Sequence, residues 1–556
     1  MNDRHDAPGE GGRAVLLRGG TVHSPADPRA TALLVQGDTV AWVGSEAGAD
    51  SILDGARGAA VEVVRLDGAL VTPAFTDAHV HATATGLALT GLDLSGAGTL
   101  GEALARVRAH AVARPGDPVL LGQGWDASRW PERRPPTRAE LDAAAGGRPL
   151  YLSRVDVHSA AVTTALLDRV PDVTALTGYH PDRPLTGAAH HAVRAAALAG
   201  VGARQRDQAQ AAALARAAAL GIGTVHECGG PDISSEDDFT GLLRLAAERP
   251  GPRVVGYWAE HVTGAAGADK VRALGAAGAA GDLFADGSLG SHTACLHQPY
   301  ADTGGTGAAY LDAAAVAAHV AACTEAGLQA GFHAIGDAAV TAVADGVRAV
   351  ADALGRARVR AARHRVEHAE MLTPRTVAAF ADLGLTASVQ PAFDAAWGGP
   401  DGMYAERLGP GRARTLNPYA ALLRAGVPLA LGSDSPVTPL DPWGGVRAAA
   451  YHRTPEHRIP VRAAFTAHTR GGWRAARRDG GGLLVPGAPA DYAVWAAGWD
   501  HGREGDGPEA AAPGAAWSTD ARPAAPALPP LAPGGQLPVC VRTVVAGRTV
   551  HERPNE

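Results

Sequence analysis

The sequence is poor in cysteine and contains a single lysine, Lys270. Its four cysteines, Cys228, Cys295, Cys323 and Cys540, are scattered, and no two of them form a CxxC pair. This spacing argues against a disulfide framework or a thiolate zinc site, and it is typical of reduced thiols. We therefore expect a cytoplasmic protein.

The sequence also lacks a run of basic residues and an apolar run long enough to span a membrane. Its formal net charge is −7 at pH 7, and the segment MNDRHDAPGEGGR at its start is too polar for a signal peptide. These features argue against nucleic acid or a membrane as a partner. A small-molecule ligand fits better, and the sequence leaves the oligomeric state open, with a homodimer as one option.

What the chain does have is enough apolar material for a large core, since hydrophobic residues make up 46% of it. Short apolar stretches alternate with alanine-rich helical stretches, the pattern of βα units in a parallel sheet. The eight stretches found match the strand number of a TIM-type (β/α)8 barrel, an α/β fold. The predicted strands are residues 71–75, 221–227, 253–260, 281–287, 328–336, 363–370, 385–391 and 427–434.

The two ends of the chain predict a second, smaller unit. Residues 1–70 and 475–556 contain strand-and-turn segments of similar character, and we expect them to pair as one β-sandwich. A Pro-, Ala- and Gly-rich stretch at about 501–535 predicts a surface loop without regular structure. The barrel then takes residues 71–474, with an insertion at about 120–194 beside its mouth.

Histidines recur where the predicted strands end, which is where barrel enzymes build their active sites. His79 and His81 are two residues apart, so both imidazoles project to the same side of an extended strand end. His333 and His368 lie in the fifth and sixth predicted strands, near their ends. Each one alone is explained as well by a buried histidine bonded to a backbone carbonyl, but four at equivalent positions predict a metal site.

Asp434 ends the eighth predicted strand, in PLALGSDSPV. A carboxylate at this position can bind a metal and accept a proton from an activated water. The alternative is an ordinary helix cap, a role that Ser433 or Ser435 could also fill. We favour the catalytic role because of the four histidines.

These residues lie within motifs that resemble the amidohydrolase superfamily, and within it the family 3 branch typified by N-substituted formamide deformylase. The resemblance covers nearly the whole chain and implies one or two divalent ions, zinc by default, with His79, His81, His333 and His368 as ligands and Asp434 as general base. The motifs that carry it are PAFTDAHVH, GIGTVHE, DLFADGSLGSHTACL, FHAIGDAAV, RVEHAEML, SVQP, LGSDSPV and PGAPADYAVW.

One position departs from the family pattern. Many relatives have a lysine, which can be carboxylated to bridge two metals, where this chain has Asp282. Lys270 lies too far upstream to replace it. Either Asp282 supplies a carboxylate to the metals, or the site holds one ion.

The resemblance also indicates residues around the metals. Asp286 is expected to orient the loop that follows it, while Glu367 and Asp337 are expected to bond to ligands rather than to bind metal. A surface position for His292 is as plausible as a substrate contact. The predicted substrate contacts are Trp125, Asp126, His158, His226 and His292.

The predicted activity is metal-dependent hydrolysis of a C–N bond outside a peptide chain, in a formamide, another N-acyl amine or a cyclic amide. A deaminase of the same superfamily is the nearest alternative, although the sequence has HAIGD rather than HxxE at His333. A catalytically silent scaffold or binding protein is a second alternative, although all four histidines and Asp434 are present.

Overall fold

The computed structural model describes residues 13–55, 60–496, 528–529 and 531–554. Eight parallel strands form one continuous sheet in the order β18-β17-β16-β15-β14-β13-β12-β7. Its two ends meet at a parallel bridge between Val80 and Ser435, so the predicted TIM-type barrel is confirmed. The strands are β7 (Phe75–Val80), β12 (Ile222–Gly229), β13 (Arg253–Trp258), β14 (Gly278–Ala279), β15 (Gln329–Ala334), β16 (Arg365–His368), β17 (Thr386–Val389) and β18 (Leu429–Leu431).

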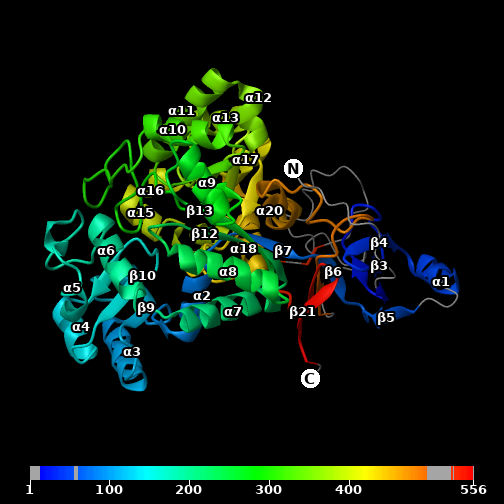
Figure 1. Cartoon of the computed structure of the whole chain (residues 1–556), viewed down its shortest axis with the longest axis horizontal. Coiled ribbons are helices and arrows are strands. Elements are labelled where there is room, and N and C mark those ends of the chain that lie inside the picture. Colours follow the sequence, from blue (N-terminus) through cyan, green and yellow to red (C-terminus); the bar gives the residue numbers. More distant parts are fainter. Residues whose placement is uncertain (1–12, 56–59, 497–527, 530, 555–556) are drawn as a thin grey trace.

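Helices surround this sheet and bury its outer face (Figure 1). Strand β7 is buried along its whole length, as a parallel strand covered on both faces should be. The helices of the barrel wall are α2 (Ala82–Thr90), α7 (Ala203–Ala219), α8 (Glu236–Glu248), α9 (Ala265–Ala273), α10 (Ala313–Glu325), α11 (Asp337–Leu354), α12 (Arg356–Ala362), α13 (Pro374–Leu383), α17 (Tyr419–Arg424), α18 (Pro442–Ala450), α19 (Val461–Thr466) and α20 (Gly472–Ala475). Three more follow β17: α14 (Pro391–Trp397), α15 (Met403–Leu408) and α16 (Pro410–Ala413).

Two predicted strands differ from the observed ones. The first splits at Ala74: β6 (Leu70–Pro73) belongs to another sheet, and β7 starts at Phe75. The fourth, predicted at residues 281–287, lies instead at Gly278–Ala279, before that range begins, and Gly281 has a φ of 88° that turns the chain out of extended conformation. Asp282 therefore lies on a loop beyond β14 instead of within the strand.

Two further sheets are built from the ends of the chain. One contains β1 (Ala14–Arg18), β3 (Ala32–Gln36), β4 (Thr39–Gly44) and β5 (Val61–Arg65), with α1 (Glu46–Gly55) beside it. The other joins β2 (Thr21–Val22) and β6 to β19 (Tyr492–Trp495), β20 (Cys540–Val545) and β21 (Arg548–Glu552). Leu33 of the first sheet and Tyr492 of the second share one core, so the sheets pack as a sandwich (Figure 1). Most of the predicted loop at 501–535 lies outside the described residues.

This sandwich covers the end of the barrel opposite the strand termini that carry the histidines. Phe75, the first residue of β7, packs edge-on against Trp443 and Trp495, with ring centroids 4.9 and 5.7 Å apart. Nε1 of Trp495 donates to Oγ1 of Thr72 at 2.9 Å. The contact fixes β19 to the start of the barrel's first strand.

The segment after α2 forms a fourth sheet in the order β11-β10-β9-β8. Its edge strand β8 (Leu92–Asp93) lies upstream of the predicted boundary at residue 120. The other elements are α3 (Leu100–Ala113), β9 (Leu120–Trp125), α4 (Arg138–Ala144), β10 (Leu150–Arg154), β11 (Ala160–Val162), α5 (Thr164–Leu167) and α6 (Gly187–Leu198). Within the described part of the chain, no helix is both long and apolar enough to cross a membrane.

Candidate metal centre

The barrel closes at the residues predicted to carry its chemistry. The backbone N–H of Asp434 donates to the carbonyl of His79 at 2.8 Å, and that of His81 donates to Ser435 at 2.9 Å. Asp434 and His368 both have left-handed backbone conformations, with φ of 56° and 68°. Such strain costs about 1–3 kcal/mol and is concentrated at functional sites.

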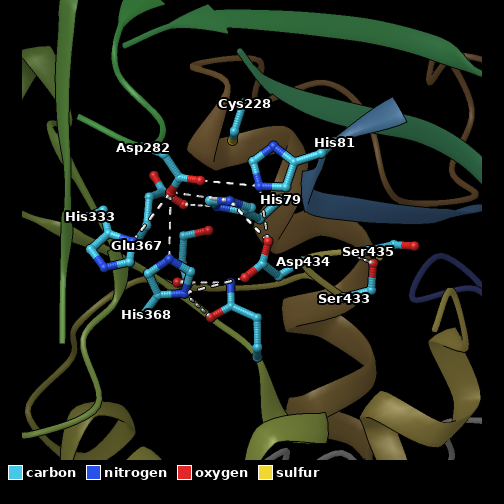
Figure 2. Close-up of polar contacts among 12 residues, drawn as sticks. His79, His81, Cys228, Asp282, His333, Glu367, His368, Ser433, Asp434 and Ser435 are labelled. Atoms are coloured by element: carbon cyan, nitrogen blue, oxygen red, sulfur yellow. Dashed lines mark hydrogen bonds and ion pairs between the residues drawn. The ribbon is translucent and has the colours of Figure 1, made fainter. Parts of the chain in front are cut away.

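Asp282 lies at the middle of the histidine cluster (Figure 2). Its Oδ2 is 3.1 Å from Nε2 of His81. Its Oδ1 is 3.4 Å from Nε2 of His79, 3.5 Å from Nδ1 of His333 and 3.5 Å from Nε2 of His368. One carboxylate therefore contacts all four predicted histidine ligands.

Asp434 adds a second carboxylate to the cluster. Its Oδ1 is 3.1 Å from Nε2 of His81 and 3.5 Å from Nε2 of His79. Its Oδ2 is 4.0 Å from Nδ1 of His368. The structure thus brings together every residue that the sequence predicts as a metal ligand.

The atoms that face this space fit a divalent cation. Buried polar atoms are nearly always hydrogen-bonded, yet five of these have no such partner: Nε2 of His79, Oδ1 of Asp282, Nδ1 of His333, Nε2 of His368 and Oδ1 of Asp434. Four of these atoms belong to two overlapping groups, His79 with His81 and Asp434, and His79 with Asp282 and His368, while Nδ1 of His333 lies 3.5 Å from Oδ1 of Asp282. The ligand atoms of each group lie within 4.8 Å of one another, so the residues present can hold one or two ions.

The other nitrogen of three rings is held by a hydrogen bond. Nδ1 of His79 is 3.0 Å from Oε2 of Glu367, and Nδ1 of His368 is 2.9 Å from Oε1 of Gln390. Nε2 of His333 donates to the carbonyl of Gly287 at 3.1 Å. Such bonds fix the orientation of each ring and leave its other nitrogen facing the centre.

Glu367 is held in turn by a buried arginine that sequence reasoning missed. Nε of Arg365 donates to Oε1 of Glu367 at 2.5 Å, and the guanidinium lies 4.3 Å from the ring centroid of Tyr257. Burial alone would raise the pKa of Glu367, but Arg365 and His79 lower it to about 2. The RVEH motif places Arg365 and Glu367 on the same side of β16, a spacing that could have revealed the pair.

The electrostatics of the cluster favour positive charge. Burial alone would lower the pKa of His81, but Asp282 and Asp434 raise it to about 9. The neighbouring imidazoles in turn overcome burial and hold the pKa of Asp282 well below its usual range. The carboxylates that attract a proton to His81 would equally stabilise a metal cation.

Asp286 organises the loop beyond Asp282. Its carboxylate accepts from the backbone N–H groups of Cys295 at 2.8 Å, Ile335 at 3.0 Å and Gly336 at 2.8 Å. Oδ1 of Asp337 accepts from the backbone N–H of His297 at 3.0 Å. These two carboxylates thus tie the loop to the residues that follow β15.

Two of the predicted substrate contacts lie at cavities. The ring of His158 is 5.0 Å from that of His333, and it lines the small space above the metal ligands. Asp126 lines a cavity of about 760 Å³ between the fourth sheet and the loops after β17 and β18. A second cavity, of about 590 Å³, reaches His81 from the side of α6 and α8.

The other three predicted contacts lie away from these cavities. His226 is fully buried, and its Nδ1 is 3.1 Å from Nη1 of Arg365. Nε1 of Trp125 donates to the carbonyl of Leu152 at 2.9 Å, inside the core of the fourth sheet. Nε2 of His292 is 2.8 Å from Oδ2 of Asp302. Each of the three has a hydrogen-bond partner within the protein, and its contact with a substrate stays a prediction.

Barrels with such a site at the carboxyl ends of their strands are the fold of metal-dependent hydrolases, and we assign the chain to that class. Residues 62–551 match the amidohydrolase family, so the chain belongs to this family. The resemblance seen in the sequence is thereby confirmed.

Individual relatives show the same relationship. The chain is 28% identical to Protein LONG AFTER FAR-RED 3 of Arabidopsis thaliana, over 86% of each chain. It is 34% identical to the N-substituted formamide deformylase of Arthrobacter pascens, over 25% of this chain and 26% of that enzyme. Among solved structures, it resembles an uncharacterized metal-dependent hydrolase from Pyrococcus horikoshii with a TM-score of 0.69 and 24% identity, over 87% of this chain and 98% of that one.

Proposed function

We propose that the protein hydrolyses a non-peptide C–N bond in a small-molecule amide, such as an N-substituted formamide or another N-acyl amine. The observation that carries this proposal is the position of Asp434. Its unpartnered Oδ1 lies 3.1 Å from Nε2 of His81, at the edge of the group of metal-ligating atoms. A carboxylate there can take a proton from a water that attacks a carbonyl carbon.

We further propose zinc as the metal, because imidazoles and carboxylates are its usual ligands in hydrolases. A divalent ion at His79, His81, His333, His368 and Asp282 would supply a Lewis acid that acidifies water and polarises the carbonyl. The name of the A. pascens relative, N-substituted formamide deformylase, supports an amide as the substrate class.

The chain's own residues would perform the remaining steps. Oδ1 of Asp434 accepts the proton of the attacking water and returns it to the leaving nitrogen. Asp282, by contacting all four histidines, holds the ligand atoms together. The ring of His158 closes one side of the space above the ligands, where it would contact the substrate.

A panel of N-alkylformamides and N-acetyl amines tests the proposal. The zinc-loaded protein should release formate or acetate, and Asp434→Asn should lower kcat by about 10²–10⁴-fold while the barrel stays folded. Asp312→Asn is the matched control, because Asp312 caps α10 and asparagine caps equally well. Full activity of Asp434→Asn, or a wild-type protein that binds no divalent metal, would contradict the proposed mechanism.

A further inference from the structure

A second buried carboxylate lies next to the metal centre and is not used by the mechanism above. Glu370 is 3% exposed, and its Oε2 forms no hydrogen bond with a described residue. No lysine or arginine of the described residues lies within ion-pair distance of it. The hydroxyl of Tyr404 lines the same cavity, lies beside the Glu370 carboxylate and has no other hydrogen-bond partner.

An unpaired buried carboxylate is costly to a fold. Removing an ionised carboxylate from water costs several kcal/mol unless a counter-charge or hydrogen-bond donors replace the water. Asp156, in the wall of the same cavity, shows the usual solution, since its Oδ2 accepts from Nη1 of Arg154 at 2.7 Å and from Oγ of Ser288 at 2.8 Å. Glu370 has no cationic partner, and its carboxylate has only the hydroxyl of Tyr404 beside it, so a cationic ligand would supply the counter-charge that it lacks.

The cavity beside Glu370 is small and walled by aromatic rings. It has a volume of about 30 Å³, room for roughly two water molecules. Phe393, Trp397 and Tyr404 are all buried, with ring centroids 5.0 Å apart for the first pair and 6.3 Å for the second. Aromatic rings around a carboxylate are the surroundings that bind organic ammonium groups, through cation–π attraction and a charge-assisted hydrogen bond.

The same cavity connects the metal centre with the larger cavity at the barrel mouth. His333, His368 and Asp434 form part of its wall. Trp397, Met403 and Val437 line both this cavity and the one of about 760 Å³. A substrate that entered from the mouth would therefore be able to place a small group beside Glu370 while its scissile bond lies at the metal ligands.

We propose that Glu370, Phe393, Trp397 and Tyr404 form a binding site for an amino group, and that the substrate is an amide carrying a small ammonium group near its scissile bond. The second part rests on the proposed function, because it locates the amino group relative to a bond cleaved at the metal centre. The first part concerns the cavity alone.

Binding of methylammonium to the metal-loaded protein tests the first part, with methanol as the uncharged counterpart of the same size. Binding of ¹³C-methylammonium is measured at pH 7 by NMR line broadening. Its dissociation constant should be at least tenfold higher for Glu370→Gln than for the wild type. Methanol should bind equally weakly to both. Glu406→Gln is the control, because it removes a half-exposed carboxylate from the neighbouring cavity wall and should change methylammonium binding less than twofold.

Trp397→Leu provides an independent variant in case Glu370→Gln does not fold. Loss of its ring should weaken methylammonium binding about 3- to 30-fold and leave methanol binding unchanged. If a folded variant, Glu370→Gln or Trp397→Leu, binds methylammonium as tightly as the wild type does, the proposed amine site is wrong.

Hydrolysis of N-(2-aminoethyl)formamide and N-propylformamide tests the second part. The wild type should prefer the first by at least tenfold in kcat/KM, and Glu370→Gln should abolish that preference through a higher KM. Equal hydrolysis of both by the wild type would overturn the substrate assignment while leaving the proposed function standing. If neither amide is cleaved, the proposed function fails, and the methylammonium result still decides the amine site.

Discussion

Asp282 and Asp434 reach the same imidazole nitrogen: each places a carboxylate oxygen 3.1 Å from Nε2 of His81. They come from the loop after β14 and the chain after β18, strands that are not neighbours in the barrel. A carboxylate in the position of Asp282 contacts all four histidines, which is the geometry a bridging ligand needs. We therefore expect Asp282 to take the part that a carboxylated lysine plays in many relatives.

The first prediction concerns metal content. Asp282→Ala should lower bound zinc per chain to about half or less of the wild-type value, because it removes the carboxylate that contacts all four histidines. His79→Ala should lower it further, since His79 belongs to both groups. Elemental analysis of protein purified without chelators gives the numbers, with exposed Asp269→Asn as control. An Asp282→Ala protein with full zinc content would rule out a bridging role.

The second prediction concerns the support of His79. Glu367→Gln should weaken zinc affinity about 10- to 100-fold, because a neutral amide orients Nδ1 of His79 less firmly than the carboxylate 3.0 Å away. Competition with a zinc chelator measures the change. Glu248→Gln, at the exposed end of α8, should match the wild type. An unchanged affinity in Glu367→Gln would mean that the pair with Arg365 serves the fold alone.

The third prediction concerns acid sensitivity and His319 on α10. The backbone N–H of Val262 donates to its Nδ1 at 2.9 Å, and its Nε2 donates to the carbonyl of Ala279 at 3.0 Å, so the ring is held neutral. Burial lowers its pKa from 6.5 to about 4. The unfolded chain therefore binds a proton first as the pH falls, and the stabilisation present above pH 6.5 is lost between 6.5 and about 4.

Urea denaturation across that range checks this prediction. The wild type should lose up to about 1.4 kcal/mol of unfolding free energy per pH unit through His319, and His319→Gln should lack that part of the slope. Identical slopes for the two proteins would show that His319 does not titrate between the folded and unfolded states.

The fourth prediction concerns the contact between the sandwich and the barrel. Trp495→Ala should lower the free energy of unfolding by about 3–5 kcal/mol, because it leaves a cavity beside Phe75 and Trp443. Calorimetric Tm values measure the loss. Val112→Ala, at an exposed position on α3, should leave the Tm within about a degree. A small effect at Trp495 would mean that the sandwich and the barrel are only loosely coupled.

The barrel and the residues that cluster at its mouth could be predicted from the sequence, because both depend on local patterns, and metal binding by these residues stays a prediction. Apolar stretches of strand length locate β12, β13 and β15 to β18, and polar residues at their ends follow from the geometry of a parallel barrel. His333 and His368 were found in this way, without knowledge of the distances between them. The family resemblance drew attention to Asp282 only as a departure from a pattern.

What the sequence could not predict depends on contacts between distant segments. The left-handed backbone of His368 and Asp434 comes from barrel closure, which no local pattern encodes. Trp125, His226 and His292 have the right chemistry for substrate contact, but each already has a partner from another part of the chain. In the sequence, Glu370 does not differ from other charged residues. Only the structure shows that it is buried without a counter-charge.

The pairing of β6 with β19 has a consequence for synthesis on the ribosome. Thr72 and Trp495, which are hydrogen-bonded across these strands, lie 423 residues apart. The strand that carries His79 is made before the rest of the barrel, whereas β19 to β21, which complete the sheet beside its starting point, are made only after all eight barrel strands. Nascent chains stalled before β19 should therefore stay open to proteases at the base of the barrel and fail to retain zinc, however complete their histidine set.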